Sequence, residues 1–405
     1  MKNPSIASGG SFGPLFPYFN TYAAHLKEQG YAVCTKCRQI NAFKRLSRWL
    51  GRTNRRVREL NESVTSNFLR SAEGRFRKED SRAMVPRLLP MLRRIGAIPA
   101  ARVQLSPAEK LTQNYQRFLS EERGLASSSV ENYGRFANRF LATKFGSGRL
   151  KLSKVSSSDV TLFVKRHAHQ HSPWQARSLV KAMRSFLRYL YYKHLVETDW
   201  SPTVPKVAFW SFSTLPKFLS PEQVRQLLSH CDRTKPLGRR DYAILLLLAR
   251  LGLRAGEVAR LNLEDIDWEN SRITVFGKSQ IRTQLPLPAD AGKAIASYLR
   301  HDRPRCACRR LFICAYAPIR GFTIGSSVSD LVKRALAKAE IVVPGKKGAH
   351  LLRHGLATAM LRKGASLDEI GEVLRHKSRE TTAIYAKVDL ESLRALALPW
   401  PGGAQ

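Results

Sequence analysis

The sequence predicts a mainly α-helical protein of three modules, the last of which contains one small antiparallel sheet. Apolar residues recur at helical spacing along most of the chain, and only residues 269–287 alternate apolar and polar side chains as a β-hairpin does. The chain has 405 residues, too many for one compact core. The stretch 201–218 contains three prolines and no helical period, and we interpret it as a linker.

Residues 1–105 and 108–200 predict two all-helical modules with a similar layout. Each shows an amphipathic helix, a glycine break, a second helix and then a third helix. The likeness suggests a duplication without establishing one. The matching positions are Tyr22, Leu26, Gly30, Phe43 and Leu46 in the first module and Tyr115, Leu119, Gly124, Phe136 and Phe140 in the second.

The last helix of the second module, within residues 175–196, has an apolar face and a basic face. A basic face is often only solvated, but in a chain of this charge a DNA backbone is at least as good an explanation. The apolar face consists of Leu179, Met183, Phe186, Leu187 and Leu190. The basic residues that we expect to bind DNA are Arg177, Lys181, Arg184 and Arg188.

The net charge points to a polyanionic partner. The chain has 69 lysines and arginines against 31 aspartates and glutamates, a formal net charge of +38. Residues 1–105 hold 20 of these basic and 6 of these acidic residues, so the excess follows the whole chain. Such an excess is typical of proteins that bind nucleic acid, and we expect double-stranded DNA rather than a membrane surface.

The same sequence predicts a cytoplasmic, nucleoid-associated protein. No apolar stretch approaches the roughly 18 residues that span a bilayer, and the N-terminus has no signal-peptide pattern. The six cysteines are expected to be reduced thiols. Cys34 and Cys37 have metal-like spacing, but no second pair of cysteines or histidines lies nearby, so we expect no metal site.

Residues 219–398 form the third predicted module. Ser220 followed by Pro221 is a typical helix start. Residues 241–253 are almost wholly apolar and predict a buried helix, and the next helix ends near Asn262, before the hairpin. The remaining predicted helices are 289–301, 325–340, 353–363, 367–375 and 380–396.

Six side chains of this module form a set suited to phosphoryl transfer. Arginine binds two phosphate oxygens at once, imidazole donates hydrogen bonds and moves protons, and a phenol can act as a covalent nucleophile. A lysine at a hairpin tip can protonate a leaving alkoxide. No paired carboxylates suggest a two-metal site, so we expect no metal and no other cofactor. The set is Arg254, Lys278, His350, Arg353, His376 and Tyr385.

These segments resemble the tyrosine recombinases, also called the phage-integrase family. The matching segments are GLRAGEV around Arg254, the hairpin GKSQIRTQLPL, HLLRHGLAT and LRHKSRETTAIYAKV. The resemblance is strong over 219–396. Residues 108–200 look like the helical core-binding domain of the family, which has a SAM-like fold.

The resemblance implies a covalent mechanism. Tyr385 would attack the scissile phosphate, form a 3′-phosphotyrosyl link and leave a 5′-hydroxyl. Lys278 would be the general acid on the 5′ oxygen, and His350 a proton acceptor from Tyr385. The implied phosphate-binding groups are Arg254, Arg353, His350 and His376, supported by the acidic residue Glu257. His354 lies about 100° from Arg353 around the helix, and we expect it to support the fold or a neighbouring side chain rather than the chemistry.

The resemblance also implies an assembly. A homotetramer on two DNA sites would exchange strands through a Holliday junction, with an accessory recombinase or directionality protein as a further partner. The tail after Tyr385 would dock on a neighbouring subunit, although its leucines could equally pack in cis. Residues 1–105 lie outside the minimal family pattern. We expect them to form an additional DNA-binding or assembly module, and the alternative is a purely structural role.

The predicted function is a site-specific DNA recombinase or integrase, of a mobile element. Two alternatives stay open at this point. One is a DNA-binding or architectural protein that has lost catalysis, which the intact set of six residues disfavours. The other is a type IB topoisomerase-like nicking-closing enzyme, which uses the same chemistry.

Overall fold

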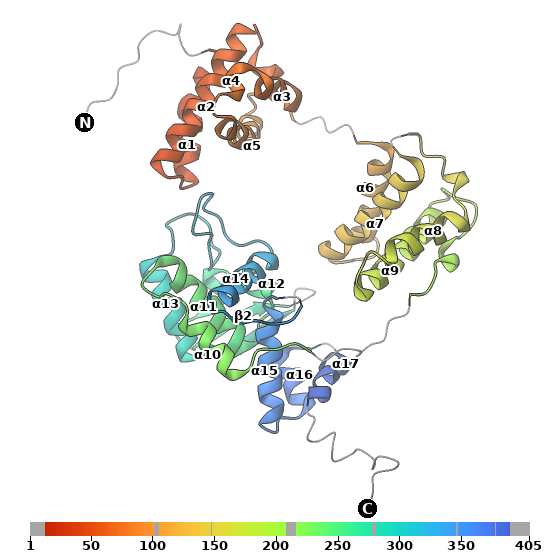
Figure 1. Ribbon diagram of the computed structural model, residues 1–405, viewed down its shortest axis with the longest axis vertical. Helices are drawn as coiled ribbons and strands as arrows, with labels where there is room; N and C mark the ends of the chain where they lie inside the picture. The colour runs from red at the N-terminus through yellow and green to blue at the C-terminus, as the bar shows by residue number, and fades with distance from the viewer. Residues whose placement is uncertain are drawn as a thin grey trace, which may run out of the picture. The chain divides into compact units, whose positions relative to one another are not determined.

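The computed structural model describes residues 13–100, 105–146, 148–207, 216–277, 281–345, 347–376 and 378–388. The chain divides into two compact units, of which one is 102–213 and the other combines 1–101 with 214–405. The second unit contains separate hydrophobic cores for its N-terminal and C-terminal parts. The protein is mainly helical with one small sheet, as predicted (Figure 1).

Residues 13–100 fold as helices around one core that includes Leu26, Phe43 and Leu46. Asn61 caps a helix by accepting a hydrogen bond from the Val64 N–H at 2.9 Å. The elements are η1 (Phe16–Tyr18), α1 (Phe19–Glu28), α2 (Val33–Arg52), η2 (Val57–Glu59), α3 (Glu62–Arg70), α4 (Ala72–Arg75) and α5 (Lys78–Arg94).

The unit 102–213 is a second helical bundle. Capping boxes at Ser106 and Ser156 fix the starts of two of its helices. The five apolar residues predicted for the last helix are all buried. The elements are α6 (Pro107–Glu121), α7 (Ser127–Phe145), η3 (Leu152–Lys154), α8 (Ser157–Ala168), α9 (Pro173–Tyr192) and η4 (Ser201–Thr203). The start of the predicted linker belongs to this unit, since Val204 is buried in its core.

The two helical bundles share the layout that the sequence suggested. Gly30 joins α1 to α2 with φ +73°, and Gly124 joins α6 to α7 with φ +57°, left-handed values that favour glycine. A short 3-10 turn and a third helix follow in both. The tyrosine, leucine and phenylalanine positions of the proposed repeat are buried in both cores.

The C-terminal part surrounds the almost wholly buried helix α11 (Pro236–Leu251). The predicted hairpin is confirmed, with Thr274 paired to Gln284 in an antiparallel sheet of order β1-β2-β3. The other elements are α10 (Pro221–Ser229), α12 (Ala255–Arg260), η5 (Leu263–Asp265), β1 (Ile266–Asp267), β2 (Arg272–Phe276), β3 (Arg282–Pro286), α13 (Ala289–His301), α14 (Gly325–Lys338), α15 (His350–Arg362), α16 (Leu367–Leu374), α17 (Arg379–Thr382) and η6 (Ala383–Val388).

The last predicted helix, 380–396, differs from the structure. The chain forms the single turn α17 and then the 3-10 segment η6, which contains Tyr385. The β-branched residues Thr381, Thr382 and Ile384 disfavour a continuous α-helix here. The predicted leucine-bearing tail, VDLESLRALALPW, lies outside the described residues from its second residue onward.

Two further findings concern the described residues only. None of their helices combines the length and apolar character needed to cross a membrane. Nor do their histidines, cysteines and acidic residues gather into a group of three that could hold a metal ion. Cys34 and Cys37 are exposed thiols that form no disulfide.

Candidate active site

Three segments that lie far apart in the sequence meet in the C-terminal part. They are the turn between α11 and α12, the first turn of α15, and the stretch from the end of α16 through η6, and Figure 1 shows α15, α16 and α17 beside one another. Gly252 makes this approach possible, since it has φ +55° and a Cβ atom there would lie 2.7 Å from Leu374. Five of the six predicted catalytic residues lie in these segments.

Arg254 caps α12 and is held by Glu257. The Arg254 Nη1 donates to Glu257 Oε1 at 2.7 Å, and the Arg254 backbone N–H donates to Glu257 Oε2 at 2.9 Å. The Glu257 side chain is almost fully buried, whereas Arg254 keeps 38% of its side-chain surface exposed. This geometry leaves part of the guanidinium accessible to an anion, in a fixed orientation.

Arg353 is buried in the first turn of α15. Its Nη1 donates to the carbonyl oxygen of Gly252 and its Nη2 to the carbonyl oxygen of Leu374. Burial, together with the charges of Arg254 and Arg375, lowers its pKa to about 10, so it stays charged at neutral pH. Arg353 therefore ties the three segments together and brings positive charge to the point where they meet.

Tyr385 is 1% exposed and contacts His354, not His350. The Tyr385 hydroxyl lies 2.8 Å from His354 Nδ1, and the two ring centroids are 5.6 Å apart. His354, which we expected to support the fold or a neighbouring side chain, thus contacts the predicted nucleophile itself. Tyr385 packs against the side of α15 that carries His354, the residue after Arg353. Tertiary structure determines this packing, and helical spacing does not predict it.

The other two predicted histidines flank this pair. The His376 ring lies parallel to the Tyr385 ring, with centroids 6.3 Å apart, and its Nδ1 is 2.7 Å from Thr382 Oγ1. His350 is exposed at the first residue of α15, with its ring centroid 5.8 Å from that of His354. His354 and His376 thus contact the phenol, and His350 lies next to His354.

The electrostatics keep two of these imidazoles neutral at pH 7. Burial lowers the pKa of His354 to about 4, with help from His350 and Arg353. Burial and the charges of Arg353 and Arg254 lower the pKa of His376 to about 4. Burial raises the pKa of Tyr385 to about 12, against the opposing effect of Arg353. The cluster has an excess of positive charge, so an entering anion would be stabilised there.

One side chain of the cluster was missed from the sequence. Arg375, between α16 and His376, donates from Nη2 to Glu257 Oε2 at 3.1 Å. Its carbonyl oxygen accepts a hydrogen bond from Arg254 Nη2 at 3.1 Å. Nothing in the local sequence distinguishes this arginine from its neighbours, because its role depends on a backbone conformation that the sequence pattern does not reveal.

Lys278 falls outside the described residues. The strands on either side of it are described and end at Phe276 and begin again at Arg282. Its assignment therefore rests on the sequence alone.

The four basic residues of α9 lie in the other unit. Arg177, Lys181 and Arg188 are exposed, whereas Arg184 is half-buried and donates to the Val204 carbonyl oxygen at 3.0 Å. Arg188 Nε also contacts Ser201 Oγ at 3.3 Å. Lys181, Arg184 and Arg188 share a surface cavity of about 710 Å³. This basic surface remains a predicted DNA contact, with part of Arg184 engaged inside the unit.

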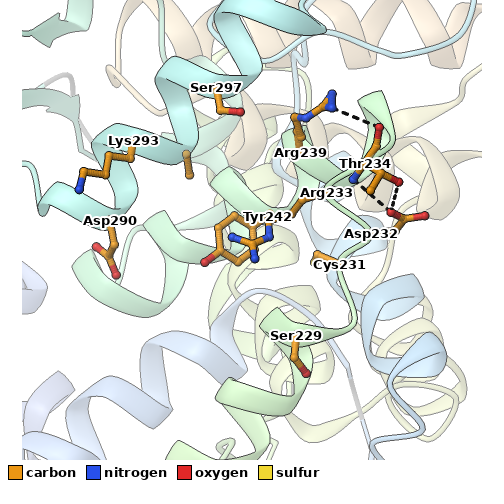
Figure 2. Close-up of a pocket in the computed structure, with 11 residues that line it drawn as sticks. Ser229, Cys231, Asp232, Arg233, Thr234, Arg239, Tyr242, Asp290, Lys293 and Ser297 are labelled. Carbon is orange, nitrogen blue, oxygen red and sulfur yellow. Dashed lines mark hydrogen bonds between the residues drawn. The ribbon is translucent and has the colours of Figure 1, made fainter.

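A second surface cavity, of about 740 Å³, lies among α10, α11 and α13 (Figure 2). Arg233 stacks over the Tyr242 ring there, and Asp232 accepts hydrogen bonds from Thr234. Its lining includes none of the residues in the cluster around Tyr385. The catalytic set therefore does not belong to this cavity.

Known proteins resemble this chain over most of its length. The family model for the phage integrase family matches residues 217–391. The protein named "Putative integrase/recombinase y4rA" of Sinorhizobium fredii is 43% identical over 397 residues, which is 97% of this chain and 96% of that protein. Tyrosine recombinase XerA of Thermococcus onnurineus is 32% identical over 288 residues, which is 70% of this chain and 93% of that protein.

Two solved structures share the fold at low identity. The XerH site-specific recombinase bound to a palindromic difH substrate, a post-cleavage complex, aligns with a TM-score of 0.54 and 19% identity over 70% of this chain and 83% of that one. A lambda integrase dimer bound to a COC′ core site aligns with a TM-score of 0.53 and 14% identity over 68% of this chain and 94% of that one.

Proposed function

The chain belongs to the phage integrase family of tyrosine recombinases, and we propose that it acts for a mobile element, cutting and rejoining DNA through a 3′-phosphotyrosyl intermediate. The observation that carries this proposal is the cluster itself. A buried phenol contacts two imidazoles, a third lies beside one of them, and two arginines hold the adjacent turn.

The proposed reaction is a transesterification at phosphorus. The Tyr385 oxygen forms a bond to the scissile phosphorus, and the bond from phosphorus to the 5′ oxygen breaks. That oxygen takes a proton, for which we assign Lys278 as the donor. Attack by a 5′-hydroxyl on the phosphotyrosine then reverses the step and rejoins the DNA, so the bond energy is kept without ATP.

Arg254 and Arg353 supply the electrostatic stabilisation in this proposal. The transition state places additional negative charge on the nonbridging oxygens, which guanidinium groups bind best. Arg254 is oriented by a buried carboxylate and partly exposed, which suits direct contact with one of these oxygens. Arg353 is fixed by two backbone carbonyl oxygens and contributes positive charge from its buried position.

We assign proton acceptance from Tyr385 to His354, in place of His350. The 2.8 Å contact and the neutral state of His354 at pH 7 support this role. The pKa of Tyr385 near 12 and that of His354 near 4 oppose transfer in the resting protein. Negative charge on the phosphate raises the basicity of the imidazole, so the transfer would accompany the attack rather than precede it.

Tyr385 has to become accessible before it reaches DNA. Only 1% of its surface is exposed, since η6 packs it against α15 and α16 in a small apolar core with Ile370 and Leu374. We propose that η6 shifts when DNA or a neighbouring subunit binds. The predicted homotetramer and the docking of the tail fit such a step.

The remaining basic surfaces would hold the DNA. In this proposal α9 contacts the backbone through Arg177, Lys181 and Arg188. The module 1–105 shares the helix order of the unit 102–213 and carries much of the basic excess, which supports a second DNA-binding module. Such a protein works on chromosomal DNA, in the cytoplasm.

Covalent capture tests the proposed function. The cleavage site is first mapped by recovering protein–DNA adducts formed by the purified protein on genomic DNA of its source organism. A duplex nicked beside that site then traps the intermediate, because the short released strand diffuses away. Wild type should form an adduct that Tyr385→Phe does not form. If the purified wild type binds genomic DNA and yields no adduct at the mapping step, the architectural alternative holds.

A further inference from the structure

Arg375 occupies a backbone position that favours glycine. It follows α16 with φ 56° and ψ 51°, the left-handed region that a side chain enters only at some energetic disadvantage. The side chain is nevertheless long, charged and only 12% exposed. The hydrogen bonds of this guanidinium therefore have to offset the cost of the left-handed backbone.

The backbone of this turn aims two consecutive carbonyl oxygens at the two catalytic arginines. The Leu374 oxygen accepts from Arg353 and the Arg375 oxygen accepts from Arg254 at 3.1 Å. The left-handed conformation of Arg375 lies between these two carbonyl groups and sets their directions. The Arg375 backbone therefore helps to position both guanidiniums, together with Glu257 for Arg254 and Gly252 for Arg353.

The Arg375 side chain holds Glu257, the carboxylate that orients Arg254. Its Nη2 donates to Glu257 Oε2 at 3.1 Å, and its Nη1 contacts the Val373 carbonyl oxygen at 3.3 Å. Glu257 also accepts both hydrogen bonds that orient Arg254. One nearly buried carboxylate thus serves two arginines, since Glu257 Oε2 accepts from both the Arg254 backbone N–H and Arg375 Nη2.

We propose that Arg375 is a positioning residue of the strand-transfer reaction, which holds Glu257 and the 374–376 turn so that Arg254 and Arg353 meet the scissile phosphate in a fixed geometry. The inference rests on the proposed function. Arg375 reaches the phosphate only through these two arginines, so its loss should slow cleavage without weakening DNA binding.

The test compares Arg375→Gly and Arg375→Lys with wild type in the nicked-duplex assay, under single-turnover conditions with saturating protein. Arg375→Gly relieves the left-handed backbone but removes the ion pair with Glu257, so its thermal midpoint should stay close to that of wild type. Its rate of adduct formation should fall roughly 10- to 100-fold, as expected when charged hydrogen bonds that hold a catalytic group are lost. Arg375→Lys keeps the charge beside Glu257 and should recover part of the rate.

Glu340→Gly is the matched control. Glu340 also has a left-handed backbone, with φ 55°, but is exposed at the end of α14. It should keep the wild-type rate, which separates the backbone effect from the loss of the guanidinium. A double variant, Arg375→Gly with Glu257→Gln, should be no slower than Glu257→Gln alone, because both changes break the same link.

The outcomes are distinct. An Arg375→Gly rate within twofold of wild type overturns the inference, as does a parallel loss of rate, DNA binding and thermal stability, which indicates a purely structural residue. A double variant that multiplies the two single effects overturns the route through Glu257. If wild type itself forms no adduct, the proposed function fails and this inference with it.

Discussion

Replacing Tyr385 by phenylalanine should weaken the fold as well as abolish cleavage. The change removes one buried hydroxyl and leaves His354 Nδ1 without its partner at 2.8 Å. A neutral hydrogen bond contributes about 0.5–1.5 kcal/mol, and a buried polar atom left unsatisfied costs about 1–3 kcal/mol. We therefore expect a loss of about 1–3 kcal/mol in the free energy of unfolding.

Urea unfolding followed by far-ultraviolet circular dichroism measures this loss. A double-mutant cycle with His354→Leu isolates the pair, and its coupling energy should be about 1 kcal/mol. Tyr115→Phe is a matched control, because the Tyr115 hydroxyl also makes a partly buried 2.8 Å hydrogen bond, to Ser185 Oγ in the other unit. It should lose similar stability and keep cleavage. A Tyr385→Phe protein as stable as wild type, with no coupling to His354, would refute the resting contact.

Two further predictions concern pH and salt. His354 and His376 have pKa values lowered from 6.5 to about 4 in the folded protein. Between pH 6.5 and pH 4 the unfolded chain therefore binds more protons than the folded chain does. Stability should therefore fall as the pH drops from 6.5 to 4, and His354→Gln should reduce that fall by up to about 3 kcal/mol in unfolding titrations at each pH. An unchanged pH dependence would contradict the buried neutral state of His354. Deleting residues 1–105 should weaken DNA binding and flatten the plot of log affinity against log salt concentration, because fewer phosphates are neutralised. An unchanged slope would assign the module to protein assembly.

Local patterns predicted most of the fold. Neighbouring residues determine these structures, so the sequence predicts them. Examples are the capped helix start at Ser220, the apolar run of α11 and the alternation of the hairpin. Over its described residues the final helix was predicted as continuous, whereas α17 ends at Thr382 and a 3-10 segment follows, because the apolar spacing ran on through β-branched residues that disfavour the helix. Periodicity shows which face is apolar, and it does not show where helical hydrogen bonding stops.

The site was predicted only in part, for a different reason. Helical spacing put His350 and Arg353 on one face of α15 and excluded His354. The site wraps around the helix, so that Arg353 contacts the Gly252 and Leu374 carbonyls while His354, one residue on, contacts Tyr385. Tertiary structure determines which element packs on which side of a helix. Periodicity in a single sequence does not reveal that choice.

The identity of the covalently modified residue tests the central claim most directly. Adducts trapped on the nicked duplex are digested with nuclease and trypsin, and the peptide that carries the residual nucleotide is sequenced by mass spectrometry. The account predicts a phosphodiester link on Tyr385, within the peptide that contains η6, and a free 5′-hydroxyl on the released strand. A nucleotide on any other residue, or a released strand with a 5′-phosphate, would contradict it.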